Sequence, residues 1–550
     1  MTQKPTYEEL EKKIAELEYE LKSTKKYGLV WDKEDTKEDV VLKCENNIPV
    51  LIQDKTKKIV LNEGENNILI EGDNYHALTA LNFIAKESID VIYIDPPYNT
   101  GREDFIYNDK YVNSDDGYLH SKWLSFMEKR LSLAKQLLKP NGIICISIDD
   151  HEQANLKLLC DKIFGKSNFV AQMIWKSKSG GANDSASIAS DHEYILTYAK
   201  LITKIKINKD TKATVTTCYN QKDENGKYSL DRLDKQSLGY HESLDFPIIG
   251  PDGKKYIVQH KDLNNRKARW RWSKETIEQR YNELVFKWPF VYTKNYEKKD
   301  GQTPRSILFD ERFGRTRTGS TDLKSIIGNQ NIFNYPKPVN LVKYIIAICS
   351  SNNGTILDFF AGSGTTGQAV MELNKEDGGH RRFILCTNNE NNICENVTYP
   401  RLKTVVTGIR PDGSKYSDGL PNNLFYFKTD FVKDENNTEQ ARYCLVEKVD
   451  GLLCIAENIC EEVERNDYSS HYKSSDNHLF IFNDYYSKEK FEEFKQRILN
   501  SDGKKIVYIY SSDNNIDTTL IVDENVTIKP IPSKIYEIYK EIVEGIKRGE

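Results

Sequence analysis

Short apolar runs alternate with amphipathic stretches over the first 150 residues of the chain. The continuously apolar runs predict buried strands, at residues 67–71, 90–94 and 142–148. The stretches between them have helical spacing, at residues 75–85 and about 122–138, and Pro140-Asn141-Gly142 is expected to stop the second helix. Continuous apolar strands alternating with helices predict an α/β fold, with a parallel sheet covered by helices on both faces.

The strand–helix pattern is interrupted once and then resumes. Between about 205 and 334 it dissolves into short polar, aromatic and basic segments, and it returns with strands at 355–358 and 382–386. Beyond about 405 a further mixed segment has strand-like runs at 479–482 and 505–510 and a helix-like run at 487–499. The predicted order is an N-terminal helix (1–30), a lead-in segment (31–66), the first half of an α/β domain (67–204), an insert (205–334), the second half (335–404) and a C-terminal α/β domain (405–550).

Residues 6–24 are predicted to form an amphipathic helix. Its apolar residues repeat at alternating spacings of four and three: Leu10, Ile14, Leu17 and Leu21. Thr6 with Glu9 fits a capping box at its start. Two interpretations stay open, a short dimerising coiled coil or a helix docked on its own domain, because fewer than three heptads are marginal for a free coiled coil.

The composition is that of a globular protein without a membrane segment. Of the 550 residues, 38% are hydrophobic and 29% charged, and no apolar run approaches the roughly 18 residues that cross a bilayer. The N-terminal 20 residues lack the apolar core of a secretory signal, so a cytoplasmic location is expected. The net charge of −5 argues mildly against a nucleic-acid binder, although its distribution decides more. The ten cysteines show no CxxC pair or zinc spacing, and the apolar surroundings of Cys145, Cys349 and Cys386 predict reduced, structural thiols.

The segment Asp95-Pro96-Pro97-Tyr98 follows the second predicted strand. In an open α/β sheet the carboxyl ends of the strands are where ligands bind. The prolines fix φ and remove backbone donors, which makes the loop stiff and leaves its carbonyls pointing outward. The Asp95 carboxylate and the Pro96 carbonyl then offer two acceptors to a substrate amino group, and the Tyr98 ring offers a flat face for a base. An ordinary strand-to-loop turn stiffened by proline would show the same tetrapeptide.

A glycine-rich turn, Asp358-Phe359-Phe360-Ala361-Gly362-Ser363-Gly364-Thr365, follows the strand at 355–358 and opens a helix predicted to run to about residue 373. Gly362 and Gly364 allow a tight turn and close backbone approach, and the helix amino terminus offers free N–H groups to a carboxylate. Nucleotide-binding sheets share such turns, but no Lys follows these glycines as it would in a phosphate loop. Glu390, past the strand at 382–386, is a candidate to hydrogen-bond a ribose hydroxyl, and a solvated loop acid is the alternative.

Together these motifs resemble those of the amino-methylating DNA methyltransferases. In that family Asp-Pro-Pro-Tyr is the catalytic signature and Phe-x-Gly-x-Gly, here Phe360 to Gly364, is the S-adenosylmethionine signature. The catalytic motif precedes the cofactor motif with a long insert between, as in the group termed beta. The resemblance implies a Rossmann-like, circularly permuted methyltransferase sheet with a target-recognition domain as its insert, and methyl transfer from S-adenosylmethionine that requires no metal.

The resemblance also distributes roles among the residues. Catalysis falls to Asp95, Pro96, Pro97 and Tyr98. Gly72-Asp73 resembles a motif that touches the cofactor's adenine, and Lys337-Pro338 one that closes over its methionine end. The candidate cofactor-binding residues are therefore Asp73, Lys337, Asp358, Phe360, Ala361, Gly362, Ser363, Gly364, Thr365 and Glu390. Aspartate rather than serine at position 95 favours the N6 amino group of adenine over N4 of cytosine.

Further segments resemble the modification subunits of type III restriction-modification systems. They are Tyr27-Gly28-Leu29-Val30-Trp31, Arg269-Trp270-Arg271-Trp272-Ser273, Lys337-Pro338-Val339-Asn340-Leu341 and Tyr426-Phe427-Lys428-Thr429-Asp430-Phe431. This implies a homodimer that acts on double-stranded DNA and recruits a separate helicase-nuclease restriction subunit, for which the last 145 or so residues are a candidate docking surface. The alternatives are a solitary methyltransferase, a cytosine-N4 or RNA adenine methyltransferase, and a DNA-binding subunit without catalysis.

A basic and aromatic run lies in the insert, where this family places target recognition. Asp262 is the only acid from 254 to 274, and a second cluster of arginines follows in a Gly/Thr-rich loop. The candidate DNA contacts are Lys267, Arg269, Arg271, Arg315 and Arg317. A solvated strand face would give the same run of charges.

Overall fold

The computed structural model describes residues 38–531, apart from short internal segments, and also Lys13, Trp31 and Glu541. The internal segments left out are 45–46, 62–63, 102–104, 108–109, 113–115, 181–187, 214–218, 263, 298–300, 329–332, 434–443, 485–486 and 511–519. The helix predicted over residues 6–24 lies, except for Lys13, outside the described residues. The chain divides into two compact units, a larger one (Met1–Asn208 with Arg305–Glu550) and a smaller one (Lys209–Pro304).

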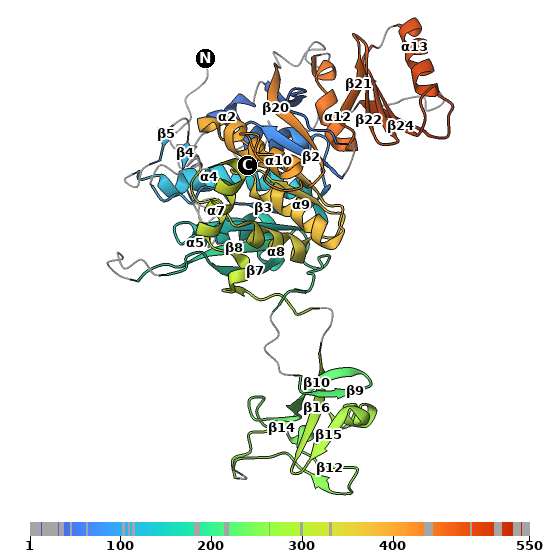
Figure 1. The fold of residues 1–550 in the computed structure, drawn as a ribbon. Helices are drawn as coiled ribbons and strands as arrows, with labels where there is room; N and C mark the ends of the chain where they lie inside the picture. The colour runs from blue at the N-terminus through green and yellow to red at the C-terminus, as the bar shows by residue number, and fades with distance from the viewer. Residues whose placement is uncertain are drawn as a thin grey trace. The chain divides into compact units, whose positions relative to one another are not determined.

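The larger unit is built on a ten-stranded sheet in the order β1-β20-β2-β19-β18-β3-β6-β8-β7-β17 (Figure 1). Its strands are β1 Asn47–Gln53, β2 Asn66–Glu71, β3 Ile89–Ile94, β6 Leu138–Ile148, β7 Phe169–Lys176, β8 His192–Ala199, β17 Ile307–Leu308, β18 Thr355–Asp358, β19 Arg382–Thr387 and β20 Asn423–Lys433. The six strands from β20 to β6 pair in parallel, as predicted. Antiparallel pairing begins on both sides of them, at β1 and at β8.

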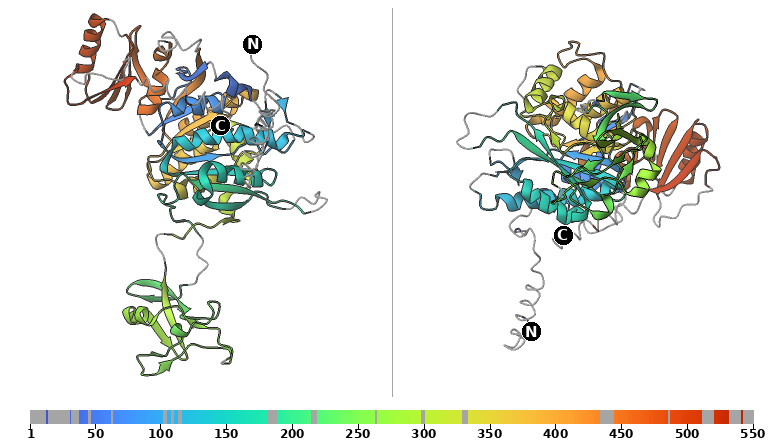
Figure 2. Two further views of the ribbon diagram at one scale, coloured as in Figure 1. Left: turned by 180° about the vertical axis from the view of Figure 1, so that it is seen from behind. Right: turned by 90° about the horizontal axis from the view of Figure 1, so that it is seen from below.

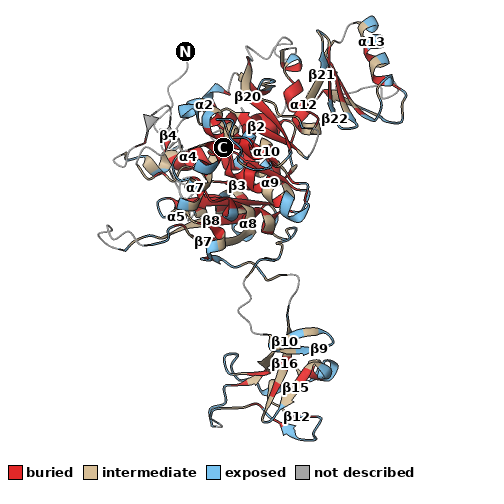
Figure 3. Ribbon diagram, in the orientation of Figure 1, coloured by how far each residue is buried: buried red, intermediate tan, exposed pale blue. Residues whose placement is uncertain are grey.

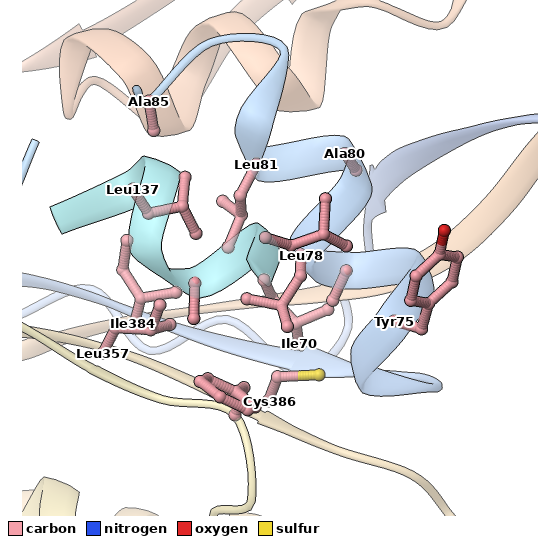
Figure 4. Close-up of a cluster of buried hydrophobic side chains, with 14 of the residues drawn as sticks. Ile70, Tyr75, Leu78, Ala80, Leu81, Ala85, Leu137, Leu357, Ile384 and Cys386 are labelled. Carbon is pink, nitrogen blue, oxygen red and sulfur yellow. The ribbon is translucent and has the colours of Figure 1, made fainter. Parts of the chain in front are cut away.

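Alternate residues of the parallel strands enter two separate cores, one on each face of the sheet. On β3, Ile92 and Ile94 join the first core, whereas Val91 and Tyr93 join the second. Figure 3 shows these central strands in red because both of their faces are buried. Figure 4 shows part of the first core, where Leu78 and Leu81 pack over Ile70, Leu357 and Ile384 of the sheet. The prediction of an α/β sheet covered on both faces is confirmed.

Helices cover these two faces in two groups. The first core receives α3 Asn74–Asn82, α4 Leu119–Leu137, α5 Gln153–Cys160 and α12 Asp450–Glu457. The second receives α7 Thr316–Ile327, α8 Val339–Cys349, α9 Thr365–Asp377 and α10 Tyr399–Thr407. Helix α4 ends before Pro140 as predicted, but the chain passes directly into β6, and a register irregularity opposite Ile89 and Val91 accommodates Pro140-Asn141-Gly142 within the strand. A short helix, α2 Asp39–Lys43, precedes the sheet.

A five-stranded sheet near the C-terminus packs beside the β1–β20 edge. Its strands are β21 Glu461–Arg465, β22 Ser469–Ser474, β23 Asn477–Phe482, β24 Lys504–Tyr510 and β25 Val526–Ile531. Helix α13 (Lys488–Leu499) covers one face through Phe494 and Ile498, and α12 lies against the other. This sheet appears orange to red in both views of Figure 2. The segment predicted to begin a separate domain at residue 405 first supplies β20 to the large sheet, because β20 pairs with β2 and β1.

The smaller unit is a compact β-rich domain inserted between β8 and β17. Its elements are β9 Gln221–Asp223, β10 Gly226–Arg232, β11 Asp234–Lys235, β12 Ile248–Ile249, β13 Lys255–Tyr256, β14 Arg269–Trp270, α6 Lys274–Gln279, β15 Leu284–Lys287 and β16 Phe290–Tyr296. Trp270 and Val291 lie in its core. The unit is shorter than the predicted insert of 205–334, since β17 pairs with β7 and α7 packs on α10 in the larger unit.

No helix among the described residues is long and apolar enough to cross a membrane. The nine cysteines that the structure describes are all free thiols, and Cys145, Cys349 and Cys386 are buried in the cores as predicted. Among the described residues no group of His, Cys, Asp or Glu side chains could hold a metal ion.

Candidate active site

The two sequence motifs meet at one edge of the large sheet. Strands β3 and β18 are parallel neighbours, with Val91 opposite Ile356 and Ile92 opposite Leu357. Asp95 comes directly after β3, and Asp358 is the last residue of β18. Because parallel strands end at the same edge, the loops after them open side by side, at the position where ligands bind in open α/β sheets.

A lysine from the segment before α8 joins the two loops. Lys337 Nζ lies 2.8 Å from each carboxylate oxygen of Asp95. The Lys337 carbonyl accepts a hydrogen bond from the Thr365 hydroxyl of the glycine turn, at 3.3 Å. The catalytic and glycine-turn motifs are therefore linked through one residue.

Three side chains, those of Asp95, Glu193 and Tyr98, form a closed cluster with Lys337. Its ammonium contacts Glu193 Oε2 at 3.3 Å as well as Asp95, and it lies 4.9 Å from the centre of the Tyr98 ring. The Tyr98 hydroxyl lies 2.9 Å from Asp95 Oδ1 and 3.0 Å from Glu193 Oε2. The Lys337 side chain is 9% exposed, whereas that of Asp95 is 28% exposed and can still receive a ligand.

Burial and the two carboxylates set the protonation states in this cluster. Burial alone would lower the pKa of Lys337, but Asp95 and Glu193 outweigh it and raise the pKa above its usual value. Burial, reinforced by the same two carboxylates, raises the pKa of Tyr98 well above its usual range. Lys337 is thus an ammonium and Tyr98 a neutral phenol at neutral pH.

The loop that carries Asp95 is held from behind. The Trp123 indole donates to the Pro97 carbonyl at 2.7 Å, so this carbonyl is not free, contrary to the expectation that the loop's carbonyls stay unpaired. Asn99 adopts a positive φ of 60° and donates to the buried carboxylate of Glu152. Among the described residues no donor reaches the Pro96 carbonyl, which remains available as an acceptor.

The glycine turn is fixed by the helix α10 behind it. Gly362 and Gly364 have φ values of +47° and +79°, which residues with a side chain rarely adopt. The buried Arg401 guanidinium donates to the hydroxyls of Ser363 (2.9 Å) and Thr365 (2.8 Å). These two candidate cofactor contacts therefore point their side chains into the protein, so that only their backbone can face a ligand.

Asp358 is buried at the start of the same turn. Its carboxylate accepts hydrogen bonds from the Thr366 hydroxyl at 2.5 Å and from the Phe360 N–H at 3.0 Å. Burial raises the pKa of Asp358 to about 7, although these two hydrogen bonds oppose the shift, and the nearby charge of Asp95 adds to it.

The remaining cofactor candidates lie at the ends of neighbouring strands. Asp73 follows β2, caps α3 by accepting from the Tyr75 N–H at 2.7 Å, and lies 3.5 Å from Arg130. Its neighbour Asn74 donates to the Phe359 carbonyl at 3.1 Å, which ties this loop to the glycine turn. Glu390 is exposed in the loop after β19, three residues beyond the strand. The Ala361 side chain is buried.

Comparison with known proteins assigns the chain to a protein family. The model of a family described as DNA methylase matches residues 89–399, more than half of the chain. The chain belongs to the DNA methylase family.

Three curated relatives show how far the likeness extends. The type III restriction-modification enzyme StyLTI Mod subunit of Salmonella typhimurium is 34% identical, over 62% of this chain and 56% of its own length. The type II methyltransferase M.KpnI of Klebsiella pneumoniae is 36% identical, over 61% of this chain and 84% of its own length. The type III EcoPI Mod subunit of Escherichia phage P1 is 32% identical, over 62% of this chain and 61% of its own length. The chain therefore matches less than two thirds of the length of these two Mod subunits.

The candidate DNA contacts of this DNA methylase differ in their exposure and in whether they already have partners within the protein. Lys267 in the smaller unit and Arg317 on α7 are exposed, and Arg269 is half-buried on β14. Arg271 pairs with Asp231 at 3.0 Å and donates to the Thr293 hydroxyl at 2.6 Å. Arg315 donates to backbone carbonyls, those of Phe309 (2.8 Å), Asp310 (3.2 Å) and Gly314 (2.9 Å). Arg271 and Arg315 thus have structural partners of their own.

Sequence reasoning missed three residues that shape the site: Trp123, Glu152 and Glu193. Trp123 and Glu152 belong to α4 and to the residue before α5, and they act from behind the loop. Glu193 is the second residue of β8, an antiparallel strand that begins at the edge where β6 ends. The available signal was the polar start of the strand 192–199. A search for polar residues at the carboxyl ends of strands misses it, because an antiparallel strand brings its amino end to this edge.

The raised pKa of Asp358 predicts a pH-dependent contribution to stability. A carboxyl with a folded pKa of about 7 and an ordinary value of 3.8 stabilises the fold below pH 4, and this stabilisation is lost as the pH rises through 7. Between pH 5.5 and 7.5 the wild type should lose about 2 kcal/mol more unfolding free energy than Asp358→Asn, which cannot titrate. Denaturant unfolding at the two pH values measures the difference.

The matched control is Asp467→Asn, which replaces an exposed carboxylate of the same unit and should follow the wild type. Parallel pH–stability curves for the wild type and Asp358→Asn would show that Asp358 has an ordinary pKa.

Proposed function

We propose that this chain is a site-specific DNA methyltransferase that transfers a methyl group from S-adenosylmethionine to N6 of adenine, as the modification subunit of a type III restriction-modification system. The observation that carries the proposal is the Lys337 contact, which places an Asp-Pro-Pro-Tyr loop and a glycine turn together at the carboxyl edge of β3 and β18. Membership of the DNA methylase family and the names of the Mod relatives support it.

The residues around the glycine turn fit the proposed cofactor. A Cβ at Gly362 would come within 3.0 Å of the Phe333 ring, and the φ of +47° is one that side chains rarely allow, so the turn requires glycine at this position. Phe360 offers a half-buried ring, and Asp73 and Glu390 are carboxylates at the ends of β2 and β19 that suit ribose hydroxyls or an amino group. When bound, S-adenosylmethionine supplies an electrophilic methyl group on a sulfonium.

The Asp95 loop then serves the amino group that receives the methyl. The N6 nitrogen of adenine is a weak nucleophile because its lone pair is delocalised into the ring. Hydrogen bonds from its two hydrogens to Asp95 and to the Pro96 carbonyl would return electron density to nitrogen and fix its direction. Because the loop is held by Trp123 and Asn99, these acceptors need little reorganisation.

The target base has to leave the duplex to reach this edge. Flipping costs a few kcal/mol, and stacking on an aromatic ring such as Tyr98 recovers about 1–3 kcal/mol of it. The proposed substrate is therefore double-stranded DNA, gripped through cations such as Lys267, Arg269 and Arg317.

A solitary methyltransferase is the second candidate. The match to M.KpnI, a type II methyltransferase, covers 84% of that relative, a larger share than for the Mod subunits named above. Under this alternative the chemistry at Asp95 is unchanged, but no restriction subunit is recruited.

Methylation assays test the chemistry. Plasmid DNA incubated with the wild type and S-adenosylmethionine, then digested to nucleosides, should contain N6-methyladenine. Asp95→Ala should lower the rate by about 100-fold or more, because it removes a preorganised acceptor, and should leave cofactor binding by calorimetry largely in place.

If the digest contained N4-methylcytosine, the target base would be cytosine and not adenine. Methylated RNA instead of DNA would change the substrate class, and an unaltered rate for Asp95→Ala would remove Asp95 from the mechanism.

DNA contact by the smaller unit is tested through salt dependence. Lys267→Ala should weaken binding to all sequences alike and reduce the slope of log affinity against log salt by about 1, as expected for one lost phosphate contact. Lys415→Ala, which removes an exposed lysine of the larger unit, is the control. An unchanged slope for Lys267→Ala would place the DNA elsewhere.

We also propose a homodimer. Light scattering of the purified chain should give about twice the monomer mass of 63.6 kDa. A monomeric mass at micromolar concentration would favour the solitary interpretation.

A further inference from the structure

The Asp95 carboxylate is engaged by Lys337 before any substrate arrives. Lys337 Nζ contacts both carboxylate oxygens at 2.8 Å, and the Tyr98 hydroxyl lies 2.9 Å from one of them. A substrate amino group needs one of these oxygens as its acceptor. Each carboxylate oxygen has two lone pairs, so Oδ2 can accept one more hydrogen bond, but Lys337 contacts both oxygens and competes with the amino group for the negative charge of Asp95.

Lys337 cannot release this contact by moving into water. Its side chain is 9% exposed, and its carbonyl is tied to Thr365 of the glycine turn. A buried ammonium that loses its carboxylate partner is strongly destabilising, so the charge needs a second acceptor close by. Among the described residues the second carboxylate that pairs with Lys337 is Glu193, with Oε2 at 3.3 Å.

Glu193 contacts the Tyr98 hydroxyl as well as the Lys337 ammonium. Its Oε2 also lies 3.0 Å from the Tyr98 hydroxyl, which has a single proton and can donate it to Asp95 or to Glu193 but not to both. Its side chain is 16% exposed, at the start of β8, on a sheet strand rather than on a loop. The position of this carboxylate is therefore fixed by the sheet.

We propose that Glu193 is a positioning residue for methyl transfer. When the substrate amino group binds Asp95, Glu193 becomes the main partner of the Lys337 ammonium and accepts the hydrogen bond of the Tyr98 hydroxyl. The inference rests on the proposed function. With a neutral residue at 193, Asp95 is the one carboxylate left in the cluster, so Lys337 holds both of its oxygens and competes with the substrate. Such a variant should therefore be impaired in its reaction with DNA and unchanged in cofactor binding.

Glu193→Gln tests this, since it keeps the size and hydrogen-bonding capacity of the side chain and removes its charge. With plasmid DNA and methyl-labelled S-adenosylmethionine, kcat/KM for DNA should fall about tenfold or more, while the Kd of the cofactor measured by calorimetry stays at the wild-type value. Glu193→Asp restores the charge at a shorter reach and should recover part of the activity. Glu128→Gln is the matched control, because Glu128 lies on α4, forms its ion pair with Lys162 rather than with the cluster, and should behave as the wild type.

Three results would overturn the inference. They are wild-type activity in Glu193→Gln, loss of cofactor binding together with activity, and a Glu193→Asp variant as slow as Glu193→Gln. If the wild type itself transfers no methyl group, the proposed function fails, and the inference fails with it. If the wild type is active and Glu193→Gln equals it, the inference alone fails.

Discussion

The parallel pairing of β3 with β18 is the constraint on which the site depends. These strands are far apart in the sequence, yet their register puts Asp95 and Asp358 at one edge of the sheet. Asp95 and Asp358 are close enough for the charge of one to raise the pKa of the other. A buried ammonium between the loops, Lys337, offsets this repulsion, and its salt bridge to Asp95 ties the Asp95 loop to the glycine turn. Had the two strands been paired in opposite directions, the motifs would lie at opposite ends of the sheet.

Most of the rigidity of this edge comes from behind the two loops. Trp123 and Glu152 hold the Asp95 loop, and Arg401 holds the glycine turn through its two hydroxyls. Each of these three side chains is buried, and each gives a polar group of the loops a hydrogen-bond partner in place of water. A loop fixed in this way keeps the Asp95 carboxylate and the Pro96 carbonyl pointing in one direction before a ligand arrives.

The sequence pattern predicted the parts of this arrangement that depend on local periodicity. Strands β2, β3, β18 and β19 are continuous apolar runs because both faces of each are buried, and such runs are easily recognised. Two outer strands of the sheet are not predicted: β17 has only two residues, and the sequence pattern assigns β20 to a separate C-terminal domain. Their place in the sheet follows from long-range pairing, of β17 with β7 and of β20 with β2, which local patterns do not record.

The same limit applies to charged side chains. Arg269 and Arg271 flank Trp270 in one basic run, yet Arg271 is engaged by Asp231 and Thr293, which stand about 40 and 20 residues away in the sequence. The motif around Lys337 predicts a cofactor contact, whereas its ammonium lies 2.8 Å from Asp95. A residue type at a given spacing restricts the chemistry that a side chain can do, but its partner is chosen by the fold.

The charges at this edge favour a cationic ligand. Asp95 and Glu193 with Lys337 leave one net negative charge, and Asp358, a third carboxyl nearby, has a pKa raised to about 7 by burial and by Asp95. A positive charge held near Asp358 would lower this pKa again and allow Asp95 and Asp358 to be ionised together. By linkage, such a ligand binds more tightly when Asp358 is ionised, so its affinity should rise with pH through the neutral range. A sulfonium or an ammonium meets this requirement, whereas an anionic phosphate in the same place would add to the repulsion. The negative charge at this edge and the missing lysine after Gly364 both disfavour an anionic phosphate as the ligand.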